Sequence, residues 1–173
     1  RPPRSTLFPY TTLFRSMISI QNQDFSIADE YAALRHRAGD AGAIVTFTGL
    51  VREIYDVSAE GSESAPVRSL FLEHYPGMTE KCLQEIQQQA EAKWPLLATR
   101  IIHRVGELHG KDQIVLVATA SAHRHAAFEA AEFIMDYLKS KAPFWKQQKT
   151  ATSNVWVESR DSDKAAIDRW QDS

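Results

Sequence analysis

The basic side chains that could do chemistry in this sequence are gathered in residues 121–146, a stretch with the pattern of one amphipathic helix and its exit turn. His123 and Arg124 lie at its start, Lys139 lies near its end, and Lys146 follows just beyond it. Cationic groups held on a rigid element suit an anionic substrate, and a lysine in such a place can act as acid, base or nucleophile. This stretch therefore predicts an anion-binding site, with the two lysines as candidates for its chemistry.

The two ends of this helix are too far apart to hold one small anion together. Arg124 and Lys139 are 15 positions apart, which is roughly 22 Å along an α-helix. Either the two residues serve opposite ends of an elongated site, or a second chain brings them together. A simpler alternative for Lys139 is a cation that stabilises the negative end of the helix dipole. For Lys146 the alternative is a solvated surface lysine.

Other candidate residues give weaker signals. Arg52 lies shortly after Gly49 at the end of a predicted strand, where a guanidinium and backbone amides suit phosphate, although an ordinary edge arginine is the alternative. His123 and His125 point about 200° apart around a helix, so they are poor candidates for chelating one metal ion. Cys82 lies in a predicted helix with no histidine at helical spacing, so any sulfur that the protein handles is expected to come from elsewhere.

The elements that must position these residues can be predicted from periodicity and capping signals. Ser26 and Asp29 resemble a capping box, Gly49 inside a strand pattern indicates a bulge or a close backbone approach, and Thr79 and Ser162 can cap later helices. Helices are expected at about 27–37, 79–94, 124–141 and 162–170, and strands at about 17–21, 43–51, 67–75, 99–106, 113–121 and 156–158. This order has no regular βαβ alternation, so it predicts a single-domain α+β fold with a mixed or antiparallel sheet and flanking helices.

The same patterns predict which parts of these elements are buried. The strand at 43–51 is rich in β-branched and aromatic residues and is expected to be largely buried. The helix at 124–141 is expected to bury a broad apolar face that includes Phe128 and Met135. Residues 53–66 are polar, acidic and without periodicity, and they predict a loop.

Composition and charge exclude several classes of protein. The 173 residues, 43% of them hydrophobic, suit one globular domain, which we place at 17–173. A formal net charge of −2 disfavours a nucleic-acid binder, so any anion site must be a local cluster. No apolar run approaches the roughly 20 residues of a membrane span. A single cysteine excludes an internal disulfide framework and a cysteine-rich zinc site, and it fits a reducing cytoplasm.

Residues 1–16 read differently from the rest of the chain. They are basic, contain no acidic residue, are rich in Ser and Thr, and nearly repeat themselves as STLF and TTLF. A transit peptide has a similar composition. We interpret them instead as a non-native, adapter-derived or disordered N-terminal extension, and we expect Met17 to be the natural start.

Several segments together resemble the family of the large, catalytic subunit of molybdopterin synthase. They are GAIVTFTGLVR (42–52), LEHYPGMTEK (72–81), HRVGEL (103–108), ATASAHRHAAFEAAEFIMDYLKSKAPFWK (118–146) and WVESRDSD (156–163). They occur in the family's order across nearly the whole of 17–170, and the SAHR and MDYLK…APFWK blocks are highly specific as a pair.

The resemblance implies a function, a fold and partners. The family converts cyclic pyranopterin monophosphate into molybdopterin by installing two sulfurs as a dithiolene. The sulfur arrives as a thiocarboxylate on the C-terminal Gly-Gly tail of a small ubiquitin-like subunit. The large subunit forms a homodimer within a heterotetramer, and it has an α/β-hammerhead-type fold. No metal or organic cofactor is implied for the sulfur transfer, nor is a nucleic-acid or membrane partner.

The resemblance also implies roles for residues that match the family's motifs. Lys139 and Lys146 match its two essential lysines, and both are expected to bind substrate and to take part in catalysis. His123 and Arg124 match a His-Arg pair at the anion pocket. The other matches are the substrate-binding positions Leu50, Val51, Arg52 and Arg160 and the apolar positions Phe47 and Met135, which are expected to line the channel for the partner's tail.

The sequence departs from the family's pattern directly after Lys146. The family usually has a basic residue and then an acid there, whereas this chain has Gln147 and Gln148. Both are expected to be substrate-binding positions by their place in the motif. Gln148 keeps the capacity for hydrogen bonding but lacks the charge, so the departure puts these two assignments in doubt and leaves that of Lys146 unaffected.

A different class of function also fits the same residues. A non-catalytic adaptor that only docks a ubiquitin-like protein would use the basic side chains as interface charges. Binding of the small pterin phosphate separates the two hypotheses, because an adaptor has no reason to bind it.

Overall fold

The computed structural model describes residues 17–52, 69–149, 153–157 and 161–171. In chain order they form β1 (Ile18–Gln21), α1 (Ile27–Arg37), β2 (Ala43–Leu50), β3 (Ser69–His74), α2 (Met78–Lys93), β4 (Leu96–Arg104), β5 (Gly106–Leu108), β6 (Gln113–Ser121), α3 (Arg124–Lys141), β7 (Phe144–Lys149), β8 (Asn154–Val157) and α4 (Asp161–Gln171). The predicted extension at 1–16, the predicted loop at 53–66 and Arg160 lie outside the described residues. Helices together with mixed and antiparallel sheets confirm the α+β class.

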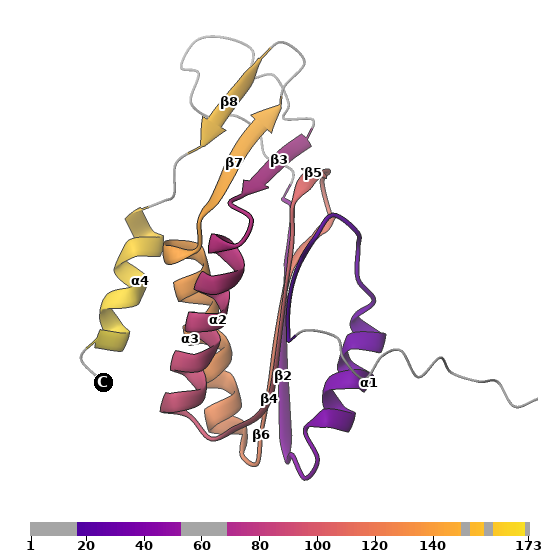
Figure 1. Ribbon diagram of the computed structural model, residues 1–173, viewed down its shortest axis with the longest axis vertical. Coiled ribbons are helices and arrows are strands. Elements are labelled where there is room, and N and C mark those ends of the chain that lie inside the picture. The colour runs from indigo at the N-terminus through magenta and orange to yellow at the C-terminus, as the bar shows by residue number, and fades with distance from the viewer. Residues whose placement is uncertain (1–16, 53–68, 150–152, 158–160, 172–173) are drawn as a thin grey trace, which may run out of the picture.

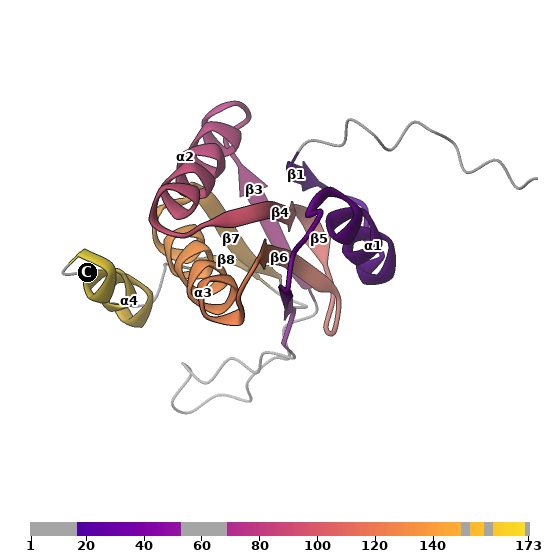
Figure 2. The same ribbon diagram turned by 90° about the horizontal axis from the view of Figure 1, so that it is seen from below.

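The main sheet has the strand order β1-β4-β6-β2, in which β1 runs parallel to β4 and the other neighbours are antiparallel. Helices α2 and α3 cover one face of this sheet and α1 covers the other (Figures 1 and 2). Successive residues of a strand point to opposite faces, so the central strands β4 and β6 supply both cores. Ile101 and Val117 pack toward α3 with Ile134, whereas Ala120 packs with Leu34 of α1.

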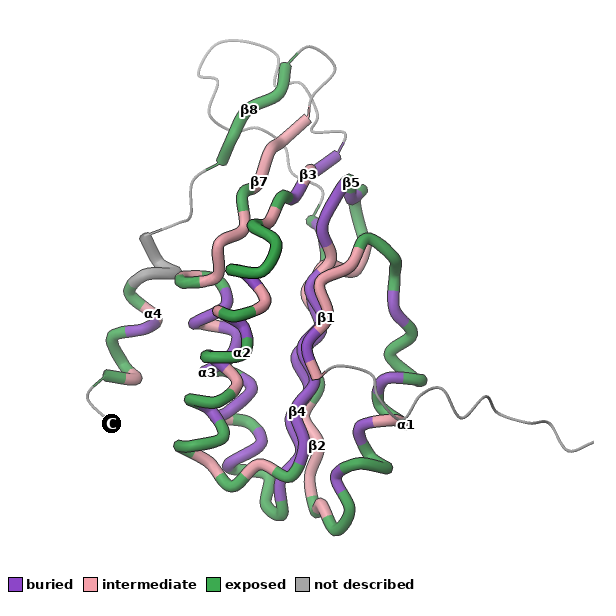
Figure 3. Tube along the Cα trace, in the orientation of Figure 1, coloured by how far each residue is buried: buried purple, intermediate pink, exposed green. Residues whose placement is uncertain are grey.

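The arm sheet has the order β5-β3-β7-β8 and is antiparallel throughout. It extends beyond the ends of α2 and α3 (Figure 1). Burial falls along it from β5 and β3 to the outer strand β8, whose residues are all exposed (Figure 3). The arm sheet is therefore rooted against the main sheet on one side and open to solvent on the other.

The two sheets share one stretch of chain. Strand β4 of the main sheet passes into β5 of the arm sheet through Val105 and Gly106. Gly106 has a φ of 85°, and a Cβ there would lie 2.6 Å from Nδ2 of Asn22. The left-handed backbone favours glycine here, and a Cβ would also require the end of the Asn22 side chain to move.

Local signals predicted several elements correctly. Helix α1 begins after Ser26, whose hydroxyl accepts a hydrogen bond from the Asp29 amide at 3.2 Å, and Gly39 follows the helix with a φ of 58°. The predicted bulge near Gly49 is confirmed by a register shift between Gly49 and Leu50. Helix α3 has its predicted bounds, and the strands predicted at 99–106 and 113–121 correspond to β4 and β6, which pair antiparallel.

Other expectations about elements were wrong. Strand β2 is an edge strand of the main sheet rather than a largely buried one, and Phe128 is 61% exposed because the small alanines beside it make the contact with the sheet. Thr79 does not cap α2, which begins at Met78 after Gly77. Helix α4 begins at Asp161, so Ser162 lies inside it.

Strand β7 was missed altogether. Its sequence FWKQQK has no apolar alternation, and the region was expected to be an exit turn. It becomes a strand because β3 and β8 pair with it on either side. Tertiary pairing, rather than local propensity, creates this element.

A buried ion pair connects α1 to β4. The Arg100 side chain is 2% exposed and donates from Nε to Glu30 at 2.7 Å, and it also donates from Nη1 to the Ser19 hydroxyl at 2.8 Å. The Glu30 side chain is 5% exposed. One guanidinium therefore joins the helix to two neighbouring strands of the main sheet.

Replacing Glu30 by alanine leaves the Arg100 charge buried without its carboxylate. We expect Glu30→Ala to lower the free energy of unfolding by about 3–5 kcal/mol, the usual cost of breaking a buried pair. Urea unfolding followed by circular dichroism measures the change. The matched control is Glu85→Ala on the exposed side of α2, which is expected to change stability by less than about 0.5 kcal/mol. A loss below about 1 kcal/mol in Glu30→Ala would contradict the structural role of the pair.

Candidate active site

Helix α3 separates the predicted basic residues into two groups. It begins directly after β6, where His123 is still extended with φ −129° and ψ 144°, so His123 and Arg124 lie exposed at that end. It ends at Lys141, next to the root of the arm sheet (Figure 1). Lys139 in its last turn is exposed, and Lys146 follows on β7. The lysines are therefore at the opposite end of the helix from the His-Arg pair.

The path from α3 into β7 is held by contacts from α2. The Thr79 hydroxyl donates to the Pro143 carbonyl at 3.3 Å and accepts from the Tyr75 amide at 3.0 Å. Thr79 is fully buried. The Cys82 thiol donates to the Lys141 carbonyl at 3.5 Å. Because Lys139 and Lys146 lie on either side of this path, these contacts help to set the geometry between them.

Strand β7 presents its predicted site residues on two faces. Lys146 lies opposite Leu72 on β3 and Val157 on β8, and Gln148 lies opposite Leu70 and Val155. Directly paired residues share a face, so Lys146 and Gln148 lie on the face of Leu70 and Leu72, which belong to a buried core cluster. Gln147 points to the other face because side chains alternate along a strand. Lys146 is half-buried there, which suits an aliphatic stem against apolar neighbours with its ammonium at the edge.

The end of β2 positions Leu50, Val51 and Arg52. A Cβ on Gly49 would lie 2.6 Å from Cγ1 of Val115, so the bulge needs glycine at this close approach. The Val51 amide donates to the Asp112 carbonyl at 2.8 Å, and the Val51 carbonyl accepts from the Lys111 amide at 2.8 Å. Val51 is 4% exposed, whereas Leu50 and Arg52 on either side of it are exposed. Val51 is therefore the fixed point that directs its two neighbours outward.

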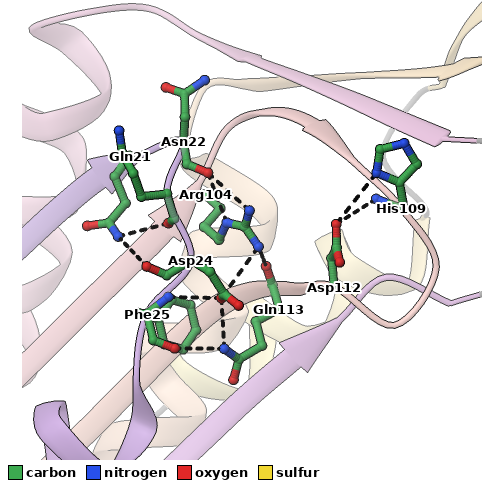
Figure 4. A network of polar contacts seen from close by, with 9 residues as sticks. Gln21, Asn22, Asp24, Phe25, Arg104, His109, Asp112 and Gln113 are labelled. Atoms are coloured by element: carbon green, nitrogen blue, oxygen red, sulfur yellow. Dashed lines mark hydrogen bonds and ion pairs between the residues drawn. The ribbon is translucent and has the colours of Figure 1, made fainter.

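A polar network holds the turn that binds Val51 (Figure 4). The Asp112 carboxylate accepts from the His109 amide at 2.8 Å. Nearby, Arg104 donates to the Asn22 carbonyl at 3.1 Å and to the Gln113 carbonyl at 3.0 Å. The side chains of this network are only partly buried, and most of their hydrogen bonds go to backbone oxygens. The network therefore fixes the path of the chain and does not form a ligand site.

Further contacts extend this network to the segment before α1. The Gln113 amide group donates to Asp24 and to the Phe25 carbonyl, each at 2.8 Å. The hydrogen bonds from Gln113 and from the Phe25 amide hold the pKa of Asp24 below its usual value. This carboxylate therefore stays charged beside Arg104, at 3.5 Å.

The structure does not bring all predicted site residues together in one chain. Arg52 lies where β6 begins and Arg124 lies just after β6 ends. Nine extended residues span roughly 27 Å. Arg52, Lys139 and Lys146 are on the side of the arm sheet, and His123 and Arg124 are at the far end of the main sheet (Figure 1). This separation confirms that one chain alone does not place all of these cations around one small anion, as the length of the helix predicted.

The two predicted tail-channel residues differ in exposure. Phe47 is 42% exposed on the edge strand β2, opposite Val117 on the face that α3 covers. Met135 is 8% exposed and packs in the largest core cluster. Phe47 is therefore accessible from solvent, whereas Met135 is almost entirely covered by the core. Their roles remain predictions.

Within the described residues, no three His, Cys, Asp or Glu side chains are grouped to hold a metal ion. Burial is the main cause that raises the pKa of the Cys82 thiol, which favours the unreactive thiol form. None of the described helices is long and apolar enough to cross a membrane.

One buried residue near the lysines was not singled out by sequence reasoning. His103 on β4 is 6% exposed, and its Nδ1 lies 2.8 Å from the Arg104 carbonyl. Its ring stacks on Phe144 at the root of β7 with the centroids 3.7 Å apart and the planes at 14°. Burial lowers its pKa to about 4, so the ring is neutral near pH 7. A histidine inside an apolar strand was the available signal, but only the fold shows what it touches.

Comparisons with known proteins agree over most of the chain. Residues 20–141 match the model of a family described as MoaE protein. The molybdopterin synthase catalytic subunit of Vibrio cholerae is 52% identical over 154 residues, which cover 89% of this chain and 97% of that protein. The solved MoaE protein of Burkholderia ambifaria has a TM-score of 0.74 and 47% identity, covering 89% of this chain and 97% of that one.

A more distant solved structure shares the fold. It is a chain in the protein–protein complex of subunits 1 and 2 of molybdopterin-converting factor from Helicobacter pylori. The TM-score is 0.67 and the identity 18%, with 84% of this chain and 92% of that chain covered. A likeness at this identity shows the fold alone.

The buried His103 makes stability depend on pH. Its pKa is about 4 in the fold and 6.5 in an ordinary environment, so between these values the unfolded chain binds the additional proton. Its contribution to stability is complete above pH 6.5 and is lost as the pH falls toward 4. We expect the free energy of unfolding to fall by about 2 kcal/mol more between pH 7 and pH 5 in the unmodified protein than in His103→Phe. Denaturant unfolding at both pH values measures this, and equal pH dependence in the two proteins would contradict it.

Proposed function

This chain belongs to the MoaE protein family, and from that premise we propose that it is the catalytic subunit of a molybdopterin synthase. It transfers sulfur to cyclic pyranopterin monophosphate and so forms the dithiolene of molybdopterin. The observation that carries the proposal is the 52% identity to the Vibrio cholerae subunit across 97% of that protein's length. The proposed catalytic unit is 17–173, and the proposed location is the cytoplasm.

The sulfur donor is a small ubiquitin-like subunit with a thiocarboxylate on its C-terminal Gly-Gly tail. An extended Gly-Gly tail has no side chains, so it can enter a narrow channel. Phe47 is the exposed apolar residue proposed to line that channel, and Met135 is proposed to line it from the core. The Helicobacter pylori chain of the same fold is itself found with a second subunit.

The substrate's phosphate is held by Arg52, His123 and Arg124. All three are exposed, and Arg52 is directed outward by the fixed position of Val51. The length of β6 separates Arg52 from the other two within one chain. We therefore propose that each site combines Arg52 of one chain with the His-Arg pair of a second copy. A homodimer within the heterotetramer supplies that second copy.

Lys139 and Lys146 act where the thiocarboxylate meets the pterin. Lys139 is proposed to stabilise developing negative charge and to carry protons, because an ammonium group can do both. Lys146 is proposed to bind substrate from the face of β7 that it shares with Gln148. Gln148 offers hydrogen bonds to the same ligand, and Gln147 lies on the other face. Leu50, Val51 and Arg160 complete the proposed substrate-binding set.

Turnover of purified protein with the thiocarboxylated partner and cyclic pyranopterin monophosphate tests the proposal. We expect Lys139→Ala to lower product formation at least 100-fold, because a positioned proton-transfer group typically contributes about 10²–10⁴-fold. Binding of the partner should stay unchanged. The matched control is Lys141→Ala, which removes the same charge from the same exposed turn about 200° around the helix. Turnover retained by Lys139→Ala would refute the catalytic role of this lysine.

Two further outcomes separate the alternatives. A stable complex with the partner, but neither product nor pterin binding, would favour the non-catalytic adaptor. A complex that binds the pterin but gives no product would indicate that activity is lost because Gln148 replaces the acid that the family usually has there. Gln148→Glu places a carboxylate on the face of Lys146 and should then restore product.

A further inference from the structure

The two proposed catalytic lysines are joined by a short crossing between two elements. Lys139 lies in the last turn of α3, and Lys146 is the third residue of β7. The crossing has a defined path at both ends, since Ala142 is extended with φ −71° and ψ 131° and the Phe144 amide donates to the Ala142 carbonyl at 2.9 Å. The distance between the lysines therefore depends on what holds this crossing against the rest of the fold.

The α3 side of the crossing is held from helix α2. Thr79 binds the Pro143 carbonyl and Cys82 binds the Lys141 carbonyl, as described above. Both contacts are to backbone oxygens, so they fix the end of the helix. They do not fix the direction in which β7 leaves.

On the β7 side, pairing with β3 and β8 holds the strand within the arm sheet, and its first residue, Phe144, packs on the core at the main sheet, where the His103 ring stacks on it. Strand β4 pairs on both sides at His103, with Ile20 of β1 and Val115 of β6, so its backbone has little freedom. The His103 ring is the side chain stacked on Phe144, the first residue of β7. Phe144 and Lys146 are two residues apart and therefore lie on one face, about 7 Å from each other along the strand.

The orientation of the ring is set as well as its position. A neutral histidine carries one N–H, and the contact of Nδ1 with the Arg104 carbonyl assigns that hydrogen to Nδ1. This bond fixes the plane of the ring, which then presents a flat face to Phe144. The other titratable groups here are His74, opposite Phe144 on β3, and Glu80, 3.6 Å from the His74 ring. His74 is on β3 of the arm sheet and Glu80 is in the first turn of α2, so neither provides a contact from β4.

We propose that His103 is a positioning residue of the sulfur-transfer site, which by stacking on Phe144 holds Lys146 at its working distance from Lys139. The inference rests on the proposed roles of the two lysines. His103 touches neither substrate nor partner in this account. It acts through Phe144 and the direction of β7.

The stack can be tested with variants that separate its ring from its hydrogen bond. His103→Asn keeps a polar side chain and removes the ring, whereas His103→Phe keeps a ring and removes the hydrogen bond. We expect kcat to fall at least tenfold in His103→Asn with KM changed less than threefold, and to stay within about threefold of the unmodified protein in His103→Phe. Phe144→Leu should lower kcat as His103→Asn does. The double variant should be no worse than either single one, because both remove the same contact.

A second measurement reports the position of Lys146 without turnover. Limited acylation by an amine-reactive reagent, followed by mass spectrometry, gives a labelling rate for each lysine. We expect the rate at Lys146 to change at least threefold in His103→Asn, and the rate at Lys149, on the other face of β7 against Phe71, to stay unchanged. Phe144→Leu provides the same readout if His103→Asn does not fold.

The outcomes distinguish this inference from the function on which it rests. If the unmodified protein makes product and His103→Asn keeps both its kcat and its Lys146 labelling rate, the positioning role is overturned. The synthase proposal is then left intact. Unmodified protein that makes no product would count against the synthase proposal, and the labelling rates would still decide whether His103 sets the position of Lys146.

Discussion

Strand β4 and its continuation into β5 are the constraint on which the rest of this structure depends. The strand lies between β1 and β6 in the main sheet and then turns through Gly106 into the arm sheet. Gly106 has a left-handed backbone with a φ of 85°, which glycine adopts readily and other residues rarely adopt. The strand that is central to the main sheet therefore continues directly into an edge strand of the arm sheet through a residue whose backbone favours glycine.

The same strand carries the side chains that hold the other layers. Arg100 binds Glu30 of α1 on one face, and Ile101 packs into the core beneath α3 on the other. His103 reaches the root of β7. Because these residues follow one another on a strand that is paired along both edges, a change in β4 is transmitted to α1, α3 and the arm together.

The distribution of charge is compatible with the proposed anionic substrate even though the chain has a net charge of −2. Its cations are placed at the ends of elements, where side chains reach solvent: Arg52 after β2, Arg124 at the start of α3 and Lys139 at its end. The rigid lengths of β6 and α3 keep these groups apart within one chain. A site assembled from two copies meets this geometry without requiring any element to bend.

Much of the fold could be read from the sequence because its signals are local. Ser26 caps α1 within its own first turn, and the periodicity of α3 places its bounds correctly. Gly49 inside a strand pattern likewise marks the bulge in β2, although the neighbour that requires glycine there, Val115, lies on another strand. The residue types of the site, and the family resemblance that they carry, are properties of the sequence alone.

What the sequence did not determine depends on contacts between distant segments. Strand β7 has no strand-like pattern and exists because β3 and β8 pair with it, and Phe128 is exposed because alanines make the contact with the sheet. The stack of His103 on Phe144 joins residues 41 positions apart. By itself the sequence determined the family, the helices and the candidate cations. Only the tertiary structure decided which cations share an end of the molecule and that His103 stacks on the first residue of β7, since burial and strand pairing are set by the whole chain.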